Sequence, residues 1–322
     1  MPHLIVPFAA CTAVAWTQTM KALPASSLKN LAKLLGGMKL VQTDTGNASS
    51  LSTPHERVLA QCQGLTSPDT LVDGLIPWAA LQAFEVFKAS ETVAPPNTAW
   101  ALITPCHWAM GREHATLTDP AALGLTPEES RTLLAAMQPY FETEGITLHF
   151  AAPERWLAEG EVFRHLPTAS LDRVLGRNVD IWLPATSTLR RLQNEMQMLL
   201  YTHPLNDERS SRRLRTVNSF WLSGTGALSR PVPTQTNPIN LPRHLAQAAF
   251  TDDWIAYAQA WSQLDAGDIA QLLARQGKGE SIRLTLCGER SAQTFETASP
   301  GIFRRISSLL HPQPPLAVLE QL

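Results

Sequence analysis

Residues 3–8 read HLIVPF, a short run without lysine, arginine, aspartate or glutamate. A run of this length and composition is typical of a buried β-strand. The apolar character continues past Cys11 to Trp16 in a way that faintly resembles a lipoprotein signal. However, no Lys or Arg precedes the run, Pro7 interrupts it, and too few residues lie before Cys11 for an export core. We therefore expect a buried first strand over His3 to Phe8.

Helical and strand patterns alternate along the rest of the chain. Leucines at 28, 31, 34 and 35 predict a helix over 26–35, and Thr126 begins a capping-box pattern for a helix to about Phe141. Further helices are predicted at 54–62, 187–202, 252–264 and 301–310, and strands at 100–105, 146–150, 179–183, 217–222 and 281–287. This alternation favours an α/β fold with a mainly parallel sheet and helices on both faces.

Two segments have a composition that suggests a special role. Residues 231–242 read PVPTQTNPINLP, which is typical of a linker between subdomains. Trp254, Tyr257 and Trp261 recur at helical spacing without accompanying cations, so we interpret them as a core stripe rather than a base-stacking platform.

The composition excludes several classes of function. The chain has 322 residues, 44% hydrophobic and 17% charged, with a formal net charge of -2. It is therefore expected to be globular and not to bind nucleic acid. No apolar run approaches the roughly 20 residues that span a bilayer, so no membrane association is expected. The scattered Cys11, Cys62, Cys106 and Cys287 favour a reducing compartment, and we expect a cytoplasmic protein.

The densest polar signal lies in residues 194–209 and 217–226, NEMQMLLYTHPLNDER and VNSFWLSGTG. One hypothesis is an anion-binding mouth that takes a phosphate or carboxylate. Its predicted ligand-binding residues are His203, Asn206, Arg209, Asn218, Ser223, Gly224, Thr225 and Gly226. In this hypothesis residues 223–226 form a loop whose backbone amides contribute to the mouth. The alternative is that His203 caps its own helix, Asn206 makes an Asx turn and the arginines are solvated.

Candidate nucleophiles lie in the polar stretch 43–53, which precedes a predicted helix start. Ser52, Thr53 and Thr45 are the candidates, although no Ser-His-Asp order or Gly-x-Ser-x-Gly elbow surrounds them and the stretch is equally typical of a plain loop. Metal ligands are not gathered at recognisable spacings, and Arg290 in the late Cys287-Gly-Glu-Arg run would repel a divalent cation. No metal or cofactor is therefore predicted.

Four segments carry a resemblance to a known family. WALITPCHW (100–108), RLQNEMQMLLYTHPLNDER (191–209), VNSFWLSGTG (217–226) and LTLCGER (284–290) resemble the RpfE-type regulatory proteins of bacteria, often labelled phosphoglycerate mutase. More distantly, the HPLN and VNSFWLSGTG segments are similar to archaeal-type cofactor-independent phosphoglycerate mutases of the alkaline phosphatase superfamily. The resemblance implies an alkaline-phosphatase-like core, residues 1–105 and 231–322, with 106–230 as an inserted smaller subdomain and returning strand.

This chain departs from the superfamily pattern at two places that the resemblance assigns to metal ligands. The first strand runs into Pro7-Phe8-Ala9-Ala10 instead of Asp-Gly, and the late motif reads Gly288-Glu289-Arg290 instead of Gly-Asp-His. The expected function is a degenerate, non-catalytic protein that binds a phosphorylated or carboxylate metabolite or a regulatory protein partner. The alternative is a phosphoglycerate mutase or related phosphotransferase or phosphatase, with Ser52 or Thr53 as nucleophile and arginines that hold the phosphate. Two divalent metals such as Mn or Zn are the corresponding cofactor alternative.

Overall fold

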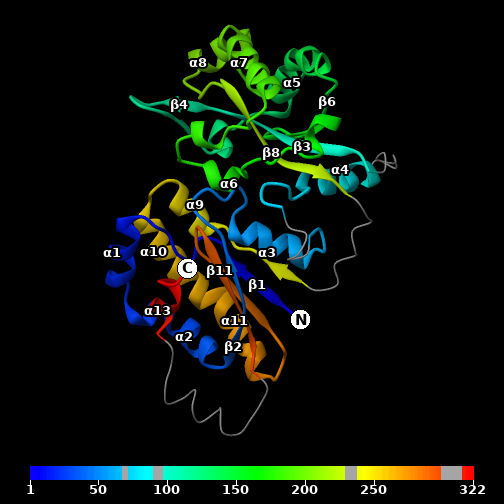
Figure 1. Ribbon diagram of the computed structural model, residues 1–322. Helices are drawn as coiled ribbons and strands as arrows, with labels where there is room; N and C mark the ends of the chain where they lie inside the picture. Colours follow the sequence, from blue (N-terminus) through cyan, green and yellow to red (C-terminus); the bar gives the residue numbers. More distant parts are fainter. Residues whose placement is uncertain (67–71, 90–96, 229–237, 299–313) are drawn as a thin grey trace. The chain divides into compact units, whose positions relative to one another are not determined.

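The computed structural model describes residues 1–66, 72–89, 97–228, 238–298 and 314–322. The chain forms two compact units (Figure 1). Unit 1 comprises Met1–Ser49, Thr53–Leu59 and Thr234–Leu322, and unit 2 comprises Ser50–Ser52 and Ala60–Pro233. Unit 1 is therefore assembled from both ends of the sequence, whereas unit 2 is almost continuous.

The sheet of unit 1 has the strand order β2-β11-β10-β1-β9. Its centre is β1 (His3–Val6), which pairs in parallel with β10 (Arg283–Cys287) and β9 (Ile239–Asn240). The outer pairs are antiparallel, β10 with β11 (Ser291–Thr297) and β11 with β2 (Met38–Thr45). The sheet is therefore mixed.

Helices pack against one face of β1 and β10 in unit 1. Leu4 and Leu284, which are register partners, join Leu31 and Leu34 of one helix and Trp261 of another in a single apolar core. Alternate side chains of a strand lie on the same face of the sheet, and residues three or four apart lie on the same face of a helix, so these apolar residues can meet in one layer. The helical segments of unit 1 are α1 (Val14–Ala22), η1 (Ala25–Leu28), α2 (Lys29–Gly36), α3 (Pro54–Cys62), α9 (His244–Phe250), α10 (Trp254–Leu264), the π-helix η5 (Asp265–Ile269), α11 (Ala270–Gly277) and α13 (Pro315–Leu319).

Unit 2 contains a wholly antiparallel sheet of order β6-β7-β3-β8 and a separate hairpin, β4-β5. Its strands are β3 (Ala99–Cys106), β4 (Trp108–Met110), β5 (Ala115–Leu117), β6 (Thr147–Ala152), β7 (Arg155–Glu159) and β8 (Ser219–Ala227). Its helices are α4 (Trp78–Ala89), η2 (Pro120–Leu123), α5 (Pro127–Glu142), η3 (Glu161–Phe163), α6 (Leu171–Val174), η4 (Asp180–Trp182), α7 (Ser187–Tyr201) and α8 (Pro204–Ser211). Leucines of α7 share one core with α5 and with Phe220 and Leu222 of β8.

The prediction of an α/β protein is confirmed in its coarse form, but the prediction of a mainly parallel sheet is wrong. Some neighbouring strands are joined by short hairpins, which forces antiparallel pairing, and strands that are distant in sequence, such as β3 and β8, are also antiparallel. Pro153 and Glu154 alone separate β6 from β7, and Gly288 to Arg290 separate β10 from β11. The sequence analysis missed the second strand of each hairpin, so the apparent alternation of strands and helices was misleading.

The individual elements agree with most of the predicted ranges. The helix at 54–62 is confirmed, the Thr126 capping box is complete, and Tyr257 and Trp261 are fully buried. The predicted strand at 179–183 is wrong, because η4 turns Val179 and Trp182 inward three residues apart, the spacing of a 3₁₀ turn. The predicted helix at 301–310 and most of the proposed linker at 231–242 lie outside the described residues.

Two further observations concern the organisation of the chain. The predicted core included residues 60–105, and these residues lie in unit 2, where β3 pairs with β7 and β8. Within the described ranges, every helix is too short or too polar to cross a membrane.

The buried His3 gives unit 1 a testable dependence on pH. Its Nε2 lies 2.8 Å from the Thr285 hydroxyl, and burial, with a smaller contribution from Arg283, lowers the pKa of His3 to about 3. The unfolded chain therefore binds a proton between about pH 6.5 and pH 3 that the folded chain does not. We expect the free energy of unfolding to fall as the pH is lowered through this window, and His3 contributes up to about 1.4 kcal/mol per pH unit to that fall.

Urea unfolding of the wild type and of His3→Gln between pH 8 and pH 4 measures this contribution. The glutamine can still bond Thr285 but does not titrate, so its curve should be the flatter of the two. His165→Gln, at an exposed position, serves as the control and should follow the wild type. Parallel curves for the wild type and His3→Gln would contradict the assignment.

Candidate functional site

The carboxyl end of β1 is held by a backbone residue in an unusual conformation. Phe8 has φ 52°, in the left-handed region that few non-glycine residues adopt. The Tyr257 hydroxyl donates to the Phe8 carbonyl at 2.7 Å, and the next amide, Ala9 N–H, donates to Cys287 O at 2.7 Å. The centroid of the Phe8 ring lies 5.9 Å from that of His55, so the residues that follow β1 contact the first turn of α3.

The start of α3 brings a hydroxyl, an imidazole and a carboxylate together. Thr53 Oγ1 donates to Glu56 Oε2 at 2.7 Å, and His55 Nε2 lies 3.3 Å from the same hydroxyl. The Thr53 amide also donates to Glu56 Oε2, at 3.0 Å. A helix N-terminus favours negative charge, so this hydroxyl has the surroundings of a possible nucleophile. Thr53 and Glu56 also have the Thr-x-x-Glu spacing of a plain capping box, in which His55 has no part.

An ion pair lies beside this cluster in unit 1. Arg57 Nε donates to Asp44 Oδ2 at 2.9 Å, and its Nη2 donates to the Arg290 carbonyl at 3.2 Å. Burial, and after it the Asp44 carboxylate, raise the pKa of Cys287 well above its usual range, although Arg57 opposes the shift. Cys287 is therefore a neutral thiol and not a nucleophile.

Ser52, the candidate nucleophile from the sequence, is bound into the backbone of unit 2. Its hydroxyl accepts from Gly74 N–H at 3.0 Å, and its amide donates to Asp73 Oδ1 at 2.9 Å. Gly74 has φ +76°, and a Cβ there would lie 2.9 Å from the Thr168 amide nitrogen, so glycine is required. Ser52 thus stabilises a tight turn.

The residues expected at the anion-binding mouth are largely engaged within unit 2. A second helix, α8, begins at Pro204, so His203 is its N-cap and not the cap of the preceding helix, and the His203 ring accepts from Leu205 N–H at 3.2 Å. Asn206 does not form the expected turn. Its side chain donates to Leu200 O and Val217 O, each at 2.7 Å, and accepts from Val217 N–H at 2.9 Å.

Arg209 is fully buried and paired. Its Nη1 donates to Glu129 Oε2 at 2.6 Å, its Nε to Arg215 O at 2.9 Å and its Nη2 to the Leu123 carbonyl. Glu129 also closes the capping box of α5 by accepting from Thr126 N–H at 3.0 Å. The guanidinium therefore links α8 to the start of α5, and none of its surface faces solvent.

Residues 223–226 form the last part of strand β8, so the expectation of a loop is wrong. Thr225 Oγ1 donates to Leu166 O at 2.5 Å and lies 3.0 Å from Thr168 Oγ1. The register with β3 shifts near this point, and Gly224, at φ +64°, lies where a Cβ would be 3.1 Å from Trp78 Cβ. The two glycines thus allow a bulge in a buried strand. Ser223 is buried in the same strand.

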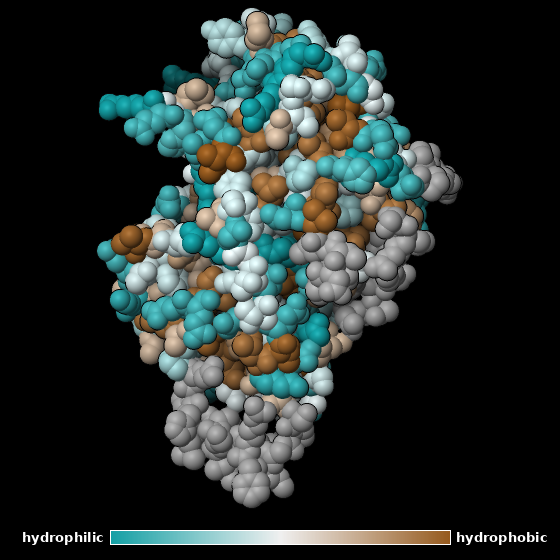
Figure 2. Space-filling view, in the orientation of Figure 1, coloured by the Kyte–Doolittle hydropathy of each residue, from teal (hydrophilic) through white to brown (hydrophobic). Residues whose placement is uncertain are grey.

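Asn218 is the predicted site residue that borders a groove. Its amide pairs with the backbone of Trp108, accepting from the N–H at 2.7 Å and donating to the C=O at 3.0 Å. The groove has a volume of about 740 Å³ and lies among the β4-β5 hairpin, η4 and α7. The hairpin that forms one wall ends in hydrophilic residues (Figure 2). The polar and aromatic side chains that line the groove are Trp108, Arg112, Glu113, His114, Asp180, Arg190, Gln193, Asn194, Gln197, Tyr201 and Asn218.

An amide that lines the groove is hydrogen-bonded to the backbone, whereas the arginines that line it have unpaired terminal nitrogens among the described residues. Gln193 Nε2 donates to Phe220 O at 2.9 Å, which anchors α7 to β8 beneath the groove. Arg190 Nε donates to Pro184 O at 3.1 Å, and its two terminal nitrogens have no partner among the described residues. Arg112 has no ion pair within those ranges. The arginines can therefore meet a ligand without first breaking a bond.

A signal in the sequence could have located this groove. Arg190, Gln193, Asn194, Gln197 and Tyr201 recur at i, i+3, i+4, i+7 and i+11, which places them on one face of α7. The turn Gly111-Arg-Glu-His supplies the opposite wall, but nothing in the sequence indicates that it lies beside this helix.

The structure thus defines a two-unit mixed α/β protein with a polar groove in unit 2 and a hydroxyl–imidazole cluster in unit 1. No protein-family model matches the sequence, and no curated protein matches it. Among the solved structures, a cofactor-independent phosphoglycerate mutase from Thermoplasma acidophilum DSM 1728 is similar with a TM-score of 0.35 and 10% identity, over 93% of this chain and 90% of that chain. The PH0037 protein from Pyrococcus horikoshii is similar with a TM-score of 0.41 and 9% identity, over 92% and 87% of the two chains. Neither resemblance assigns an activity to this chain.

The role of Arg209 can be tested by stability alone. Arg209→Ala removes the buried partner of Glu129 and leaves it only the exposed Arg212 at 3.7 Å. We expect the variant to lower the free energy of unfolding by about 3 kcal/mol without any ligand. Arg215→Ala, at an exposed position, should change it by less than about 0.5 kcal/mol. Chemical denaturation followed by circular dichroism measures both variants. Equal stabilities would mean that Arg209 is not part of a buried pair.

Proposed function

We propose that this chain is a binding protein for a small anionic metabolite, a phosphorylated or carboxylate compound with hydroxyl groups, held in the groove of unit 2. The observation that carries the proposal is the pair of arginines, Arg112 and Arg190, on the walls of a groove with a floor of amides. Guanidinium groups match the oxygens of phosphate and carboxylate in geometry and charge.

The remaining polar residues that line the groove indicate which groups the ligand carries besides its anionic group. Glu113 and Asp180 balance the two arginines in formal charge, and neither forms an ion pair within the described residues. Carboxylates and the amides of Gln197 and Asn194 accept hydrogen bonds from hydroxyl groups. A bare inorganic anion would leave these acceptors without a donor, so a hydroxylated anion fits the groove better.

The resemblance to RpfE-type proteins and phosphoglycerate mutases suggests a phosphatase-like scaffold without the two-metal site, and we extend the proposal to a regulatory role. The carboxyl end of β1 does not fit two divalent cations. Asp44 is already neutralised by Arg57, and Glu289 accepts from the Thr12 hydroxyl at 2.5 Å. Among the described residues, no three histidine, cysteine, aspartate or glutamate side chains gather at one point. Phe8 and Ala9 follow the strand where the superfamily pattern has an acid.

Binding can be measured by titration calorimetry with 3-phosphoglycerate and glycerol 3-phosphate, using inorganic phosphate and glycerol as the simpler halves. We expect the hydroxylated phosphates to bind most tightly and Arg190→Gln to weaken them at least about tenfold. Arg191→Gln is the matched control. Arg191 is next to Arg190 in the sequence, but its side chain pairs with Glu144 and does not line the groove. Equal loss in both variants, or no binding by any anion, would overturn the proposal.

The alternative is a phosphotransferase or phosphatase that uses the Thr53 hydroxyl, and the proximity of His55 Nε2 at 3.3 Å favours it. In that case Glu56 Oε2, which already accepts the hydrogen bond of the Thr53 hydroxyl at 2.7 Å, would take the proton as Thr53 Oγ1 attacks phosphorus. The bond between phosphorus and the leaving oxygen would break on the opposite side, and the His55 imidazole would lie beside the attacking oxygen.

Hydrolysis of p-nitrophenyl phosphate, with and without added Mn²⁺ or Zn²⁺ and with a chelator, separates the two functions. The alternative predicts turnover that Thr53→Val abolishes and that Thr53→Ser and Ser52→Ala retain, because serine keeps both the hydroxyl and the helix cap. The binding function predicts no turnover by any of these proteins under any of these conditions.

A further inference from the structure

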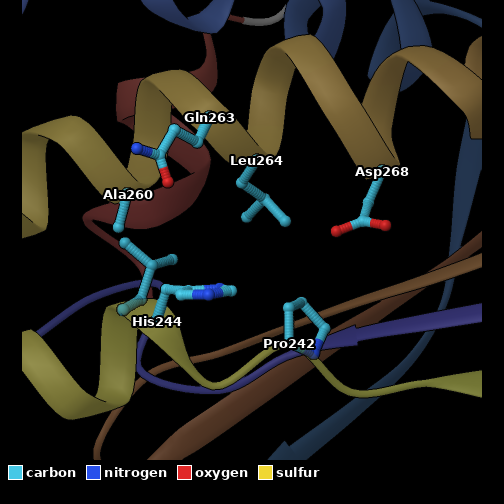
Figure 3. Close-up of a pocket in the computed structure, with 7 residues that line it drawn as sticks. Pro242, His244, Ala260, Gln263, Leu264 and Asp268 are labelled. Carbon is cyan, nitrogen blue, oxygen red and sulfur yellow. The ribbon is translucent and has the colours of Figure 1, made fainter.

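A second cavity lies wholly within unit 1, apart from the groove and from the Thr53 cluster. Its volume is about 120 Å³, and it lies where the segment between β9 and α9 meets α10 and the π-helix η5. Pro242, Ala260 and Leu264 supply apolar surface, and His244, Gln263 and Asp268 supply polar groups. Figure 3 shows the His244 ring and the Asp268 carboxylate directed toward the space between them.

The π-helical turn η5 carries two aspartates with different surroundings, one in the core and one at the cavity. Asp265, at its first position, is buried and accepts from Asn30 N–H at 3.1 Å and from Leu31 N–H at 2.8 Å at the start of α2. Asp268, at its fourth position, instead lines the cavity. A π-helical turn is wider than an α-helical turn and is uncommon, and such turns are frequently retained at functional positions.

Charge limits the chemistry that the cavity can accept. Asp268 is the one lining residue with a formal charge when His244 is neutral. Asn240 Nδ2 donates to its Oδ1 at 2.8 Å, and its second oxygen has no partner among the described residues. Within the same ranges, the side chains of His244 and Gln263 form no hydrogen bond. The cavity therefore offers a negative charge and neutral polar groups, but no cation.

Size and surface limit the ligand further. A cavity of about 150 Å³ accommodates benzene, so this cavity of about 120 Å³ suits a molecule of about five heavy atoms. Divalent cations prefer several carboxylate or imidazole ligands, and a single aspartate and a single histidine are too few to hold one well. The apolar walls favour a ligand with a short carbon chain.

We propose that this cavity binds a small primary ammonium compound, with its cationic nitrogen on Asp268 and its carbon chain against Leu264 and Ala260. The ammonium donates to the available oxygen of Asp268, and the Gln263 amide and His244 ring meet further polar groups of the ligand. This site is independent of the anion groove, because its lining residues all belong to unit 1.

The test uses the full chain and three isosteric probes: propylamine, 1-propanol and propionate. Saturation-transfer NMR at neutral pH, with titration to obtain Kd, should show propylammonium bound and the alcohol and the acid not. Asp268→Asn keeps the shape and the oxygen that Asn240 contacts, and it should weaken propylammonium at least about tenfold. Asp252→Asn, an exposed position with φ 53° that asparagine tolerates, is the control and should bind as the wild type does.

Three outcomes would overturn the proposal. The alcohol could bind as tightly as the amine, which would make the cavity merely apolar. Asp268→Asn could bind the amine unchanged while retaining the wild-type melting temperature. Finally, Zn²⁺ or Mg²⁺ alone could displace propylammonium with a Kd below that of the amine, which would make the cavity a metal site.

Discussion

The parallel pairing of β1 with β10 is the interaction on which unit 1 depends. It joins Leu4 to Leu284 and Val6 to Leu286, so the first residues of the chain are completed by residues about 280 positions later. Both strands send apolar side chains to the core that holds α2 and α10. The same pairing fixes where β1 ends, and hence where Phe8, Cys287 and the start of α3 meet. Without this pairing, the helices that carry the Thr53 cluster and the cavity beside α9 would have no sheet to pack against.

The arginines of unit 2 divide into two kinds, and this division separates structure from binding. Arg209 is fully buried and uses its donors on Glu129 and on two carbonyls, so it stabilises the junction of α8 with α5. Arg112 and Arg190 line a groove, and their terminal nitrogens have no partner among the described residues. Burial removes an arginine from ligand chemistry even where its sequence neighbours resemble a binding motif. Within the HPLNDER segment, Asn206 and Arg209 are buried and bonded inside unit 2, whereas Asp207 and Glu208 are exposed.

Local signals in the sequence were sufficient for several helices but not for the site. The capping box at Thr126 and the proline at the start of α3 act within one helical turn, so their effects could be read directly. Arg209 was misread because its partner, Glu129, is 80 residues away. Residues 223–226 were misread because glycine in a strand bulge and glycine in a loop have the same local composition. Strand direction was also out of reach, since hairpin partners such as β7 and β11 carry too many polar residues to stand out.

The nearly continuous unit 2 and the two-ended unit 1 also imply an order of events during synthesis. Residues 60–233 can complete their sheet and core as soon as they have left the ribosome. Strand β1 must wait for β10, and at about 5–20 residues per second the delay is roughly 15 to 55 seconds. During that interval HLIVPF exposes two unpaired edges and a row of leucine, isoleucine and valine. This apolar segment therefore leaves the ribosome well before the strand that pairs with it, and its unpaired edges are open to association until β10 has been made.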